Sequence, residues 1–243
     1  MVAPPEPNRF ATFARVLADL DAPLAPGSRL LDLGCGSGTL VQAACDMGLD
    51  AHGCDFREWI ERPYLDTSHT ASLMQAGRLQ PIETPYRLPF PDATFDTVIS
   101  DQVFEHVQDW DTTLAELARV MKPGARFLHL FPARASILEV HVFVPFAGAF
   151  HPRWWLTLWA ALGVRNGFQR GLGVHETVEQ NAEYLRTMVN YLPSGEIARR
   201  FSRHFDCSNA EAQFMRYSPR TRVFLLPALY RTFWHHCVFG VKR

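Results

Sequence analysis

The stretch LLDLGCGSGTL, from Leu30 to Leu40, decides the fold of this protein. A short apolar run enters a turn in which glycine stands at positions 34, 36 and 38. A strand that enters a glycine-rich turn is typical of the ligand-binding units of parallel α/β sheets. The dinucleotide fingerprint is G-x-G-x-x-G, so the third glycine here stands one position early. The turn therefore predicts a ligand site in an α/β fold.

A carboxylate inside this run restricts the ligand. Asp32 stands near the end of the expected strand, where it repels a phosphate and attracts a positively charged group. S-adenosylmethionine carries an ammonium and a sulfonium and has no phosphate. Because glycine lets a ligand approach the backbone closely, the turn predicts contact with the methionine part of this molecule.

A second carboxylate follows the next expected strand. Asp55 stands 21 positions after Gly34 and directly follows the run 51–54. This spacing suits a carboxylate that accepts hydrogen bonds from ribose hydroxyls. A helix N-cap is the structural alternative for Asp55.

Strands and helices alternate through the first half of the chain. Apolar spacing predicts a helix over 9–20, and Ser37 is expected to cap the helix after the glycine turn. Asp109 or Asp111 is expected to cap a later helix. This alternation predicts βαβ units and a parallel sheet. The expected strands are 29–33, 51–54, 79–82, 95–100 and 126–131.

The alternation stops after residue 131. Residues 132–192 are rich in aromatic residues, proline and glycine, and we expect an insertion there with a helix over 176–191. The alternation then resumes to the end of the chain. The expected elements are a helix at 194–205, a strand at 205–215, a helix around 221–233 and a strand at 235–242.

Composition excludes several classes of protein. The chain has 243 residues and a net charge of −1, which suits one α/β domain and shows no electrostatic footprint for nucleic acid. Five cysteines without a CxxC pair indicate neither a disulfide framework nor a zinc knuckle. The start shows no signal-peptide pattern, so a cytoplasmic location is the default. The apolar stretches 137–164 and 223–241 are interrupted by proline and charged residues. Weak association with a membrane surface stays open, and nothing indicates an oligomeric state.

Four successive segments carry a family resemblance. They read LLDLGCGSGTL, HGCDF, LPFPDATFDTVISDQVFEHV and LAELARVMKPGARFLHLFP. Over residues 29–131 the chain resembles the class I S-adenosylmethionine-dependent methyltransferases, in the type 11-like branch that methylates small molecules, quinones, lipids and sugars. A weaker likeness covers 194–243.

The resemblance implies a fold and a division of the chain. The fold is α/β, with a Rossmann-like, seven-stranded, mostly parallel sheet flanked by helices, a reversed hairpin at its C-terminal edge, and a helical and aromatic insertion after strand five. The chain is expected to form a single domain, residues 1–243. Within it, 9–131 would bind the cofactor, 132–192 would form a cap that binds the acceptor, and 193–243 would complete the sheet.

The resemblance also implies residue roles. Asp55 would bind the ribose, and Phe56 would pack near the adenine. Relatives contact the adenine about four positions before LPF, where this chain has Glu83, Thr84 and then Pro85, which has no N–H to donate. Adenine recognition is therefore expected to rest on Glu83 or Thr84. The methionine part would lie on Asp32, Gly34, Cys35, Gly36 and Gly38, and on the backbone of Ser100, Asp101 and Gln102.

Catalytic candidates come from histidines in and beyond the motif region. Methyl transfer to a hydroxyl group benefits from a base, because the hydroxyl loses its proton as the new bond forms. Glu139 and His141 stand two apart, so an extended segment would place them on one face as an oriented base. His106 and His151 are further candidates, and helix anchoring is the structural alternative for His106.

Two further features stay open. Trp154, Trp155 and Trp159 suit either an acceptor pocket or the insertion's own core. The residue spacing indicates no dedicated metal site, and scattered carboxylates that hold magnesium leave no pattern.

The expected function is S-adenosylmethionine-dependent O-methylation of a small molecule, a sugar or a lipid-linked glycan, with S-adenosylhomocysteine as product. C- or N-methylation of a quinone or an amine is one alternative. A protein that binds S-adenosylhomocysteine without catalysis is another.

Overall fold

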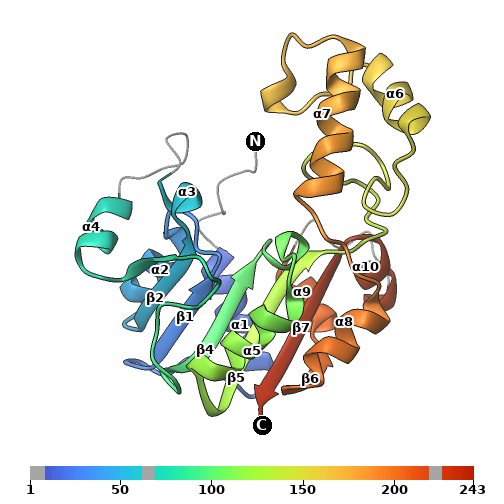
Figure 1. The fold of residues 1–243 in the computed structure, drawn as a ribbon. Helices are drawn as coiled ribbons and strands as arrows, with labels where there is room; N and C mark the ends of the chain where they lie inside the picture. Colours follow the sequence, from blue (N-terminus) through green and yellow to red (C-terminus); the bar gives the residue numbers. More distant parts are fainter. Residues whose placement is uncertain (1–8, 62–68, 219–225) are drawn as a thin grey trace.

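The computed structural model describes residues 9–61, 69–218 and 226–243. These residues form a seven-stranded sheet in the order β3-β2-β1-β4-β5-β7-β6, drawn in Figure 1. Neighbours run parallel from β3 to β5, whereas β7 is antiparallel to β5 and to β6. The predicted sheet with its reversed hairpin is therefore confirmed. The strands are β1 Arg29–Leu33, β2 Asp50–Phe56, β3 Leu79–Ile82, β4 Phe95–Asp101, β5 Met121–Pro132, β6 Phe205–Asn209 and β7 His235–Lys242.

Apolar side chains alternate between the two faces of the sheet, and helices cover both. In β1, Leu30 packs into one core, whereas Leu31 and Leu33 pack into the other. The first core contains residues of α1 Arg9–Asp19, α2 Thr39–Asp46, α3 Arg57–Ile60, α4 Thr70–Gln75, α9 Glu211–Tyr217 and α10 Pro227–Phe233. The second contains residues of α5 Trp110–Val120 and α8 Ser194–Phe201.

Two local expectations are wrong. Gly38, not Ser37, stands at the N-cap of α2, because the chain enters the helix through a residue with φ 86°. The strand expected at 205–215 ends at Asn209, because Ala210 and Phe214 share a helical face that packs into the core. Of the helix expected around 221–233, residues 219–225 lie outside the described residues.

The insertion forms a compact unit of its own. Its helices α6 Arg153–Ala161 and α7 Val174–Thr187 pack together and project beyond the edge of the sheet where β5 ends (Figure 1). Trp155 and Trp159 pack against its core, so the core interpretation holds for them. Trp154 is 61% exposed. Among the described helices, none has the length and apolar character needed to cross a membrane.

Candidate functional site

The glycine turn lies where the strand order reverses between β1 and β4. Open α/β sheets bind ligands at this position. Gly34 has φ 71°, and a Cβ there would stand 2.3 Å from Cγ2 of Val103, so the turn packs directly against the segment after β4. At Gly36 no described atom lies within 4 Å of the place a Cβ would take. The turn is therefore closed on the protein side and open at its middle glycine.

Carboxylates surround this turn. Burial raises the pKa of Asp32 well above its usual range, and the carboxylates of Asp101 and Asp55 raise it further. A cation placed among these groups relieves their mutual repulsion. S-adenosylmethionine supplies two positive charges in its methionine part, so the residues present fit this cofactor.

Asp55 is held in place by the turn itself. Its Oδ2 accepts the N–H of Gly36 at 3.0 Å, and its Oδ1 accepts the N–H of Phe56 at 2.8 Å. Each carboxylate oxygen has a second lone pair that could accept a ribose hydroxyl. The ring of Phe56 is 40% exposed and lies 6.2 Å from the ring of Tyr86, which leaves an apolar surface beside Asp55.

Two other predicted cofactor residues, Ser100 and Asp101, form hydrogen bonds with residues outside the turn. Ser100 is fully buried, backbone included, and its Oγ lies 2.7 Å from Nδ1 of His129, so contact of its backbone with a cofactor stays a prediction. Burial lowers the pKa of His129 to about 3, which keeps this core histidine neutral. Asp101 accepts two hydrogen bonds from Arg9 at 2.6 and 2.8 Å.

The remaining cofactor candidates differ in exposure. Cys35 is buried, and burial raises the pKa of its thiol, so it is an inert part of the turn. Gln102 has φ 60° and donates its N–H to the carbonyl of Leu130. Glu83 and Thr84 are exposed, and their contact with adenine stays a prediction.

Glu139 is the centre of a hydrogen-bonded group in the insertion. It is 1% exposed. Its Oε1 accepts from Nδ1 of His141 and from the hydroxyl of Tyr191, both at 2.7 Å. Its Oε2 accepts the N–H groups of His141 and Val142 at 2.8 and 2.7 Å. Although burial alone would raise it, hydrogen bonds from His141 and Tyr191 lower the pKa of Glu139 below its ordinary value. An ionised carboxylate only accepts, so Nδ1 of His141 carries a proton, and in the neutral ring Nε2 carries a lone pair.

The backbone around this pair differs from the expectation. The predicted contact between Glu139 and His141 forms, but the segment is a turn and not an extended strand. The N–H of Phe143 donates to the carbonyl of Glu139 at 2.9 Å. The turn folds the carboxylate back onto the N–H groups that follow it, as acidic side chains commonly do in turns.

His106 comes from the sheet part of the chain, outside the insertion, and contacts His141 of this group. It ends the short 3-10 helix η1 Phe104–His106, which follows β4. Its ring lies 4.9 Å from the ring of His141 and 6.2 Å from that of Trp59. Its Nδ1 lies 2.8 Å from the carbonyl oxygen of Met188, which fixes Nδ1 as the donor.

The end of the insertion is tied to η1. The N–H of Asn190 donates to the carbonyl of Glu105 at 2.6 Å, and its side-chain amide donates to the carbonyl of Val107 at 2.9 Å. These bonds place Tyr191, and through it Glu139, beside the carboxyl end of β4. The insertion therefore reaches the same edge of the sheet as the glycine turn.

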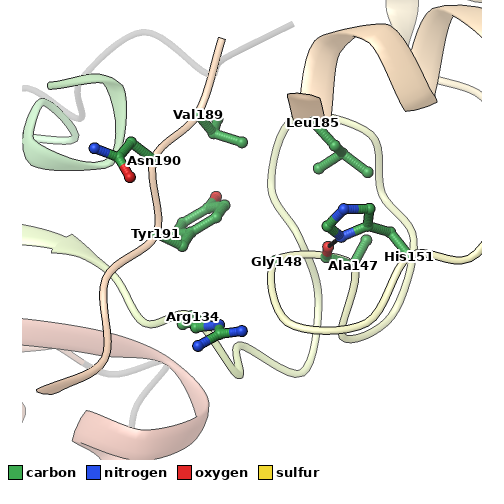
Figure 2. A pocket seen from close by; sticks show the side chains of 8 residues that line it. All are labelled: Arg134, Ala147, Gly148, His151, Leu185, Val189, Asn190 and Tyr191. Atoms are coloured by element: carbon green, nitrogen blue, oxygen red, sulfur yellow. Dashed lines mark hydrogen bonds between the residues drawn. The ribbon is translucent and has the colours of Figure 1, made fainter. Parts of the chain in front are cut away.

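His151 lies in a different part of the insertion. Its Nδ1 donates to the carbonyl of Ala147 at 2.6 Å. Figure 2 shows His151, Arg134 and Tyr191 around a cavity of about 290 Å³. The hydroxyl of Tyr191 donates to Glu139, so Tyr191 connects the wall of this cavity to the Glu139–His141 pair, although neither member of the pair lines the cavity.

Four residues of this region escape sequence reasoning. Glu105 is adjacent to His106, and only its place in the FEHV segment could have indicated that it belongs to the site. Arg9, Arg134 and Tyr191 carry no motif and are far from the glycine turn in sequence. Only the folded chain brings Arg9 to Asp101 and Tyr191 to Glu139.

Comparison with known proteins agrees with this geometry. The family model described as "Methyltransferase domain" matches residues 31–129. Residues 31–129 are thus a class I S-adenosylmethionine-dependent methyltransferase domain of the type 11 branch, on a Rossmann-like fold.

Individual relatives match about two fifths of the chain. The demethylmenaquinone methyltransferase of Symbiobacterium thermophilum is 33% identical over 121 residues, which cover 43% of this chain and 43% of that protein. The O-methyltransferase resE of Aspergillus sclerotiorum is 32% identical over 104 residues, 41% of this chain and 38% of its own length. The chain thus matches about two fifths of these relatives.

A solved structure shows the same fold over nearly the whole chain. The S-adenosylmethionine-dependent methyltransferase of Mesorhizobium loti has a TM-score of 0.55 at 16% identity and covers 97% of this chain and 98% of its own.

Proposed function

We propose that this protein transfers a methyl group from S-adenosylmethionine to a small acceptor molecule and releases S-adenosylhomocysteine. One observation carries the proposal: the glycine turn lies at the switch point of the sheet, among carboxylates that favour a cation. The family match over residues 31–129 supports it.

The residues of the chain suit an oxygen acceptor. When bound, the cofactor supplies an electrophilic methyl group on a sulfonium leaving group. Nε2 of His141 would accept the proton that the acceptor hydroxyl loses on methylation. Glu139 keeps Nδ1 protonated and stabilises the imidazolium that forms. Tyr191 holds Glu139 from the other side. His106, whose ring contacts that of His141, would help to position it.

The insertion would form the acceptor-binding cap. The cavity beside Tyr191 measures about 290 Å³, near the lower end of the range of roughly 300–1,000 Å³ for small-molecule sites. Arg134 and His151 give it a polar lining, which suits a small molecule, a sugar or the sugar end of a lipid-linked glycan.

C- or N-methylation is the alternative, with a quinone or an amine as acceptor. The demethylmenaquinone methyltransferase among the relatives supports this choice. A double substitution of Glu139 and His141 that leaves turnover intact would favour it, since a carbanion or amine acceptor needs less base. A non-catalytic protein would bind S-adenosylhomocysteine and label no acceptor.

A membrane surface is a candidate partner. Trp154 and Leu158 of α6 and Leu162 at its C-cap stand four apart and are 61%, 43% and 67% exposed. Such an apolar stripe suits the interface of a lipid bilayer. Sedimentation with liposomes tests this association.

Cofactor binding is the first test. Calorimetry should show S-adenosylhomocysteine binding to the wild-type chain and a loss of at least about tenfold for Asp55→Asn, since a hydrogen bond to a charged group contributes roughly 1.5–3 kcal/mol. Asp50→Asn is the matched control, because Asp50 lies at the opposite end of the same strand. Equal affinities for both variants would contradict the assigned site.

Methyl transfer is the second test. Methyl-labelled S-adenosylmethionine is incubated with hydroxyl, amine and quinone acceptors and with a fractionated extract of the source. Label in a hydroxyl-bearing fraction, lost in Asp55→Asn, supports O-methylation. Retained cofactor binding with no labelled fraction supports the non-catalytic alternative.

A further inference from the structure

We propose that Glu105, His106 and His141 form a binding site for a divalent transition-metal ion, Zn²⁺ in the first instance. One ligand atom of each residue, a carboxylate oxygen or a histidine nitrogen, lies within 4.8 Å of the other two. Two imidazoles and one carboxylate are a donor set that Zn²⁺ and its neighbours prefer, whereas Mg²⁺ and Ca²⁺ prefer oxygen.

The first argument is the state of Glu105. It is 1% exposed, and neither of its carboxylate oxygens has a hydrogen-bond partner among the described residues. A buried carboxylate without a partner is costly, so its retention requires an explanation. Nε2 of His106 lies 4.0 Å from Oε1 of Glu105, which is longer than a hydrogen bond. At this distance His106 does not form a hydrogen bond with the carboxylate of Glu105.

The second argument is the orientation of the two histidines. Nδ1 of His141 donates to Glu139, and Nδ1 of His106 donates to the carbonyl oxygen of Met188. Both Nε2 atoms then carry a lone pair in the neutral rings. Metal-binding histidines characteristically donate the other ring N–H to a carboxylate or a backbone carbonyl, and both kinds of partner are present here.

The distances suit a site that closes around the ion. Zinc with bonds of about 2.1 Å in a tetrahedral arrangement separates its ligand atoms by roughly 3.4 Å. In the structure these atoms lie 4.8 Å or less apart, so ion binding would require small side-chain rotations of Glu105 and His106 on the short helix η1. Three protein ligands leave a fourth position open, as in catalytic zinc sites.

The site has a consequence for the acceptor, which rests on the proposed function. An ion here takes the lone pair of His141, so it replaces the free imidazole as the group that acts on the acceptor. Its open position would bind an acceptor oxygen and lower the pKa of that hydroxyl. A metal site here therefore favours acceptors that bear oxygen, and it gives the buried carboxylate of Glu105 the role of a metal ligand.

Metal binding is tested without acceptor or cofactor. The chelator-treated full chain is titrated with Zn²⁺ in a calorimeter and with Co²⁺ while its visible absorption is followed. We expect one ion per chain and loss of the Co²⁺ bands in Glu105→Gln and His141→Gln. Glu139→Gln should weaken affinity by about 10- to 100-fold, because it removes the partner that orients His141. His175→Ala, an exposed histidine of α7, should bind like the wild type.

Thermal unfolding with and without Zn²⁺ tests the site even in a variant of lower stability, because each variant is compared with itself. Zn²⁺ should raise the Tm of the wild type and of His175→Ala, but not that of Glu105→Gln. The proposal is overturned if Zn²⁺ binds equally to wild type and Glu105→Gln, or if it does not bind at all. If Zn²⁺ does not bind while His141→Gln still abolishes methyl transfer, the free-base function stands alone. If Zn²⁺ binds but S-adenosylhomocysteine does not, the metal site stands and the proposed function fails.

Discussion

The glycine turn and the Glu139–His141 group lie at the same edge of the sheet, but they are built in opposite ways. The turn is continuous in sequence, and its shape depends on the left-handed backbone conformation of Gly34 and Gly36. The histidine group gathers side chains from positions as far apart as 105 and 191. The comparison teaches that the proposed cofactor site, the glycine turn, depends on local conformation, whereas the proposed acceptor site, the Glu139–His141 group, depends on how the insertion docks.

The largest expected effect is on the rate of methyl transfer, and it separates the Glu139–His141 group from the glycine turn. His141→Ala should lower methyl transfer by about 100- to 10,000-fold, because it removes the group that acts on the acceptor proton. S-adenosylhomocysteine affinity should stay within about twofold, since the cofactor side is built by other residues. Turnover and calorimetry are measured on one preparation, with His175→Ala as control. A parallel loss of cofactor affinity would break the separation.

A substitution in the turn tests local conformation. Gly34→Ala places a Cβ 2.3 Å from Val103 at φ 71°, so we expect roughly 2–5 kcal/mol of destabilisation from clash and left-handed strain. Gly27→Ala is the matched control, because Gly27 has φ 76° with no described atom within 4 Å of that Cβ. It should cost about 1–2 kcal/mol. Chemical denaturation measures both, and Val103→Ala in the Gly34→Ala background should restore part of the loss. Equal losses in the two single variants would contradict the packing argument.

The acceptor side should respond to pH through Glu105. Burial raises the pKa of Glu105, and the carboxylates of Asp101 and Glu139 add to the shift. Its stabilising contribution is then complete below the unfolded value of about 4.3 and is lost as pH rises through the folded value. In chelator-treated protein, Glu105→Gln should raise the Tm by about 2–4 °C near pH 8, which corresponds to roughly 1 kcal/mol, and by less near pH 5. A variant that is less stable than wild type near pH 8 would show that Glu105 has a partner in the metal-free protein.

The smallest effect concerns the exposed face of the insertion. Trp154 is 61% exposed, so Trp154→Ala should change stability by less than about 0.5 kcal/mol. Trp155 packs on the insertion core and donates its ring N–H to the carbonyl of Pro145 at 2.8 Å, so Trp155→Ala should cost at least about 2 kcal/mol. Thermal unfolding of the two neighbours gives the contrast, and liposome binding of Trp154→Ala shows whether the exposed ring contacts lipid. Equal stability losses would mean that the insertion has no separate core.

Local patterns sufficed for the core of the fold. The apolar run before Gly34 predicts β1 at its observed bounds, and the periods of the other strands predict the sheet through β5. Asp109 is the N-cap of α5, as one of the two expected candidates. These features depend on residues that are neighbours in sequence, because a strand, a turn and a cap are each formed within a few residues.

What the sequence determined by itself is therefore the class of fold and the glycine turn with its carboxylates. The tertiary structure alone decided which polar groups meet across the insertion. The contact of Glu139 with His141 is foreseeable from their spacing, but the hydroxyl of Tyr191, the carbonyl of Met188 and the buried carboxylate of Glu105 are not. Their positions follow from the bonds of Asn190 to Glu105 and Val107, and sequence periodicity carries no information on contacts between residues more than 50 positions apart.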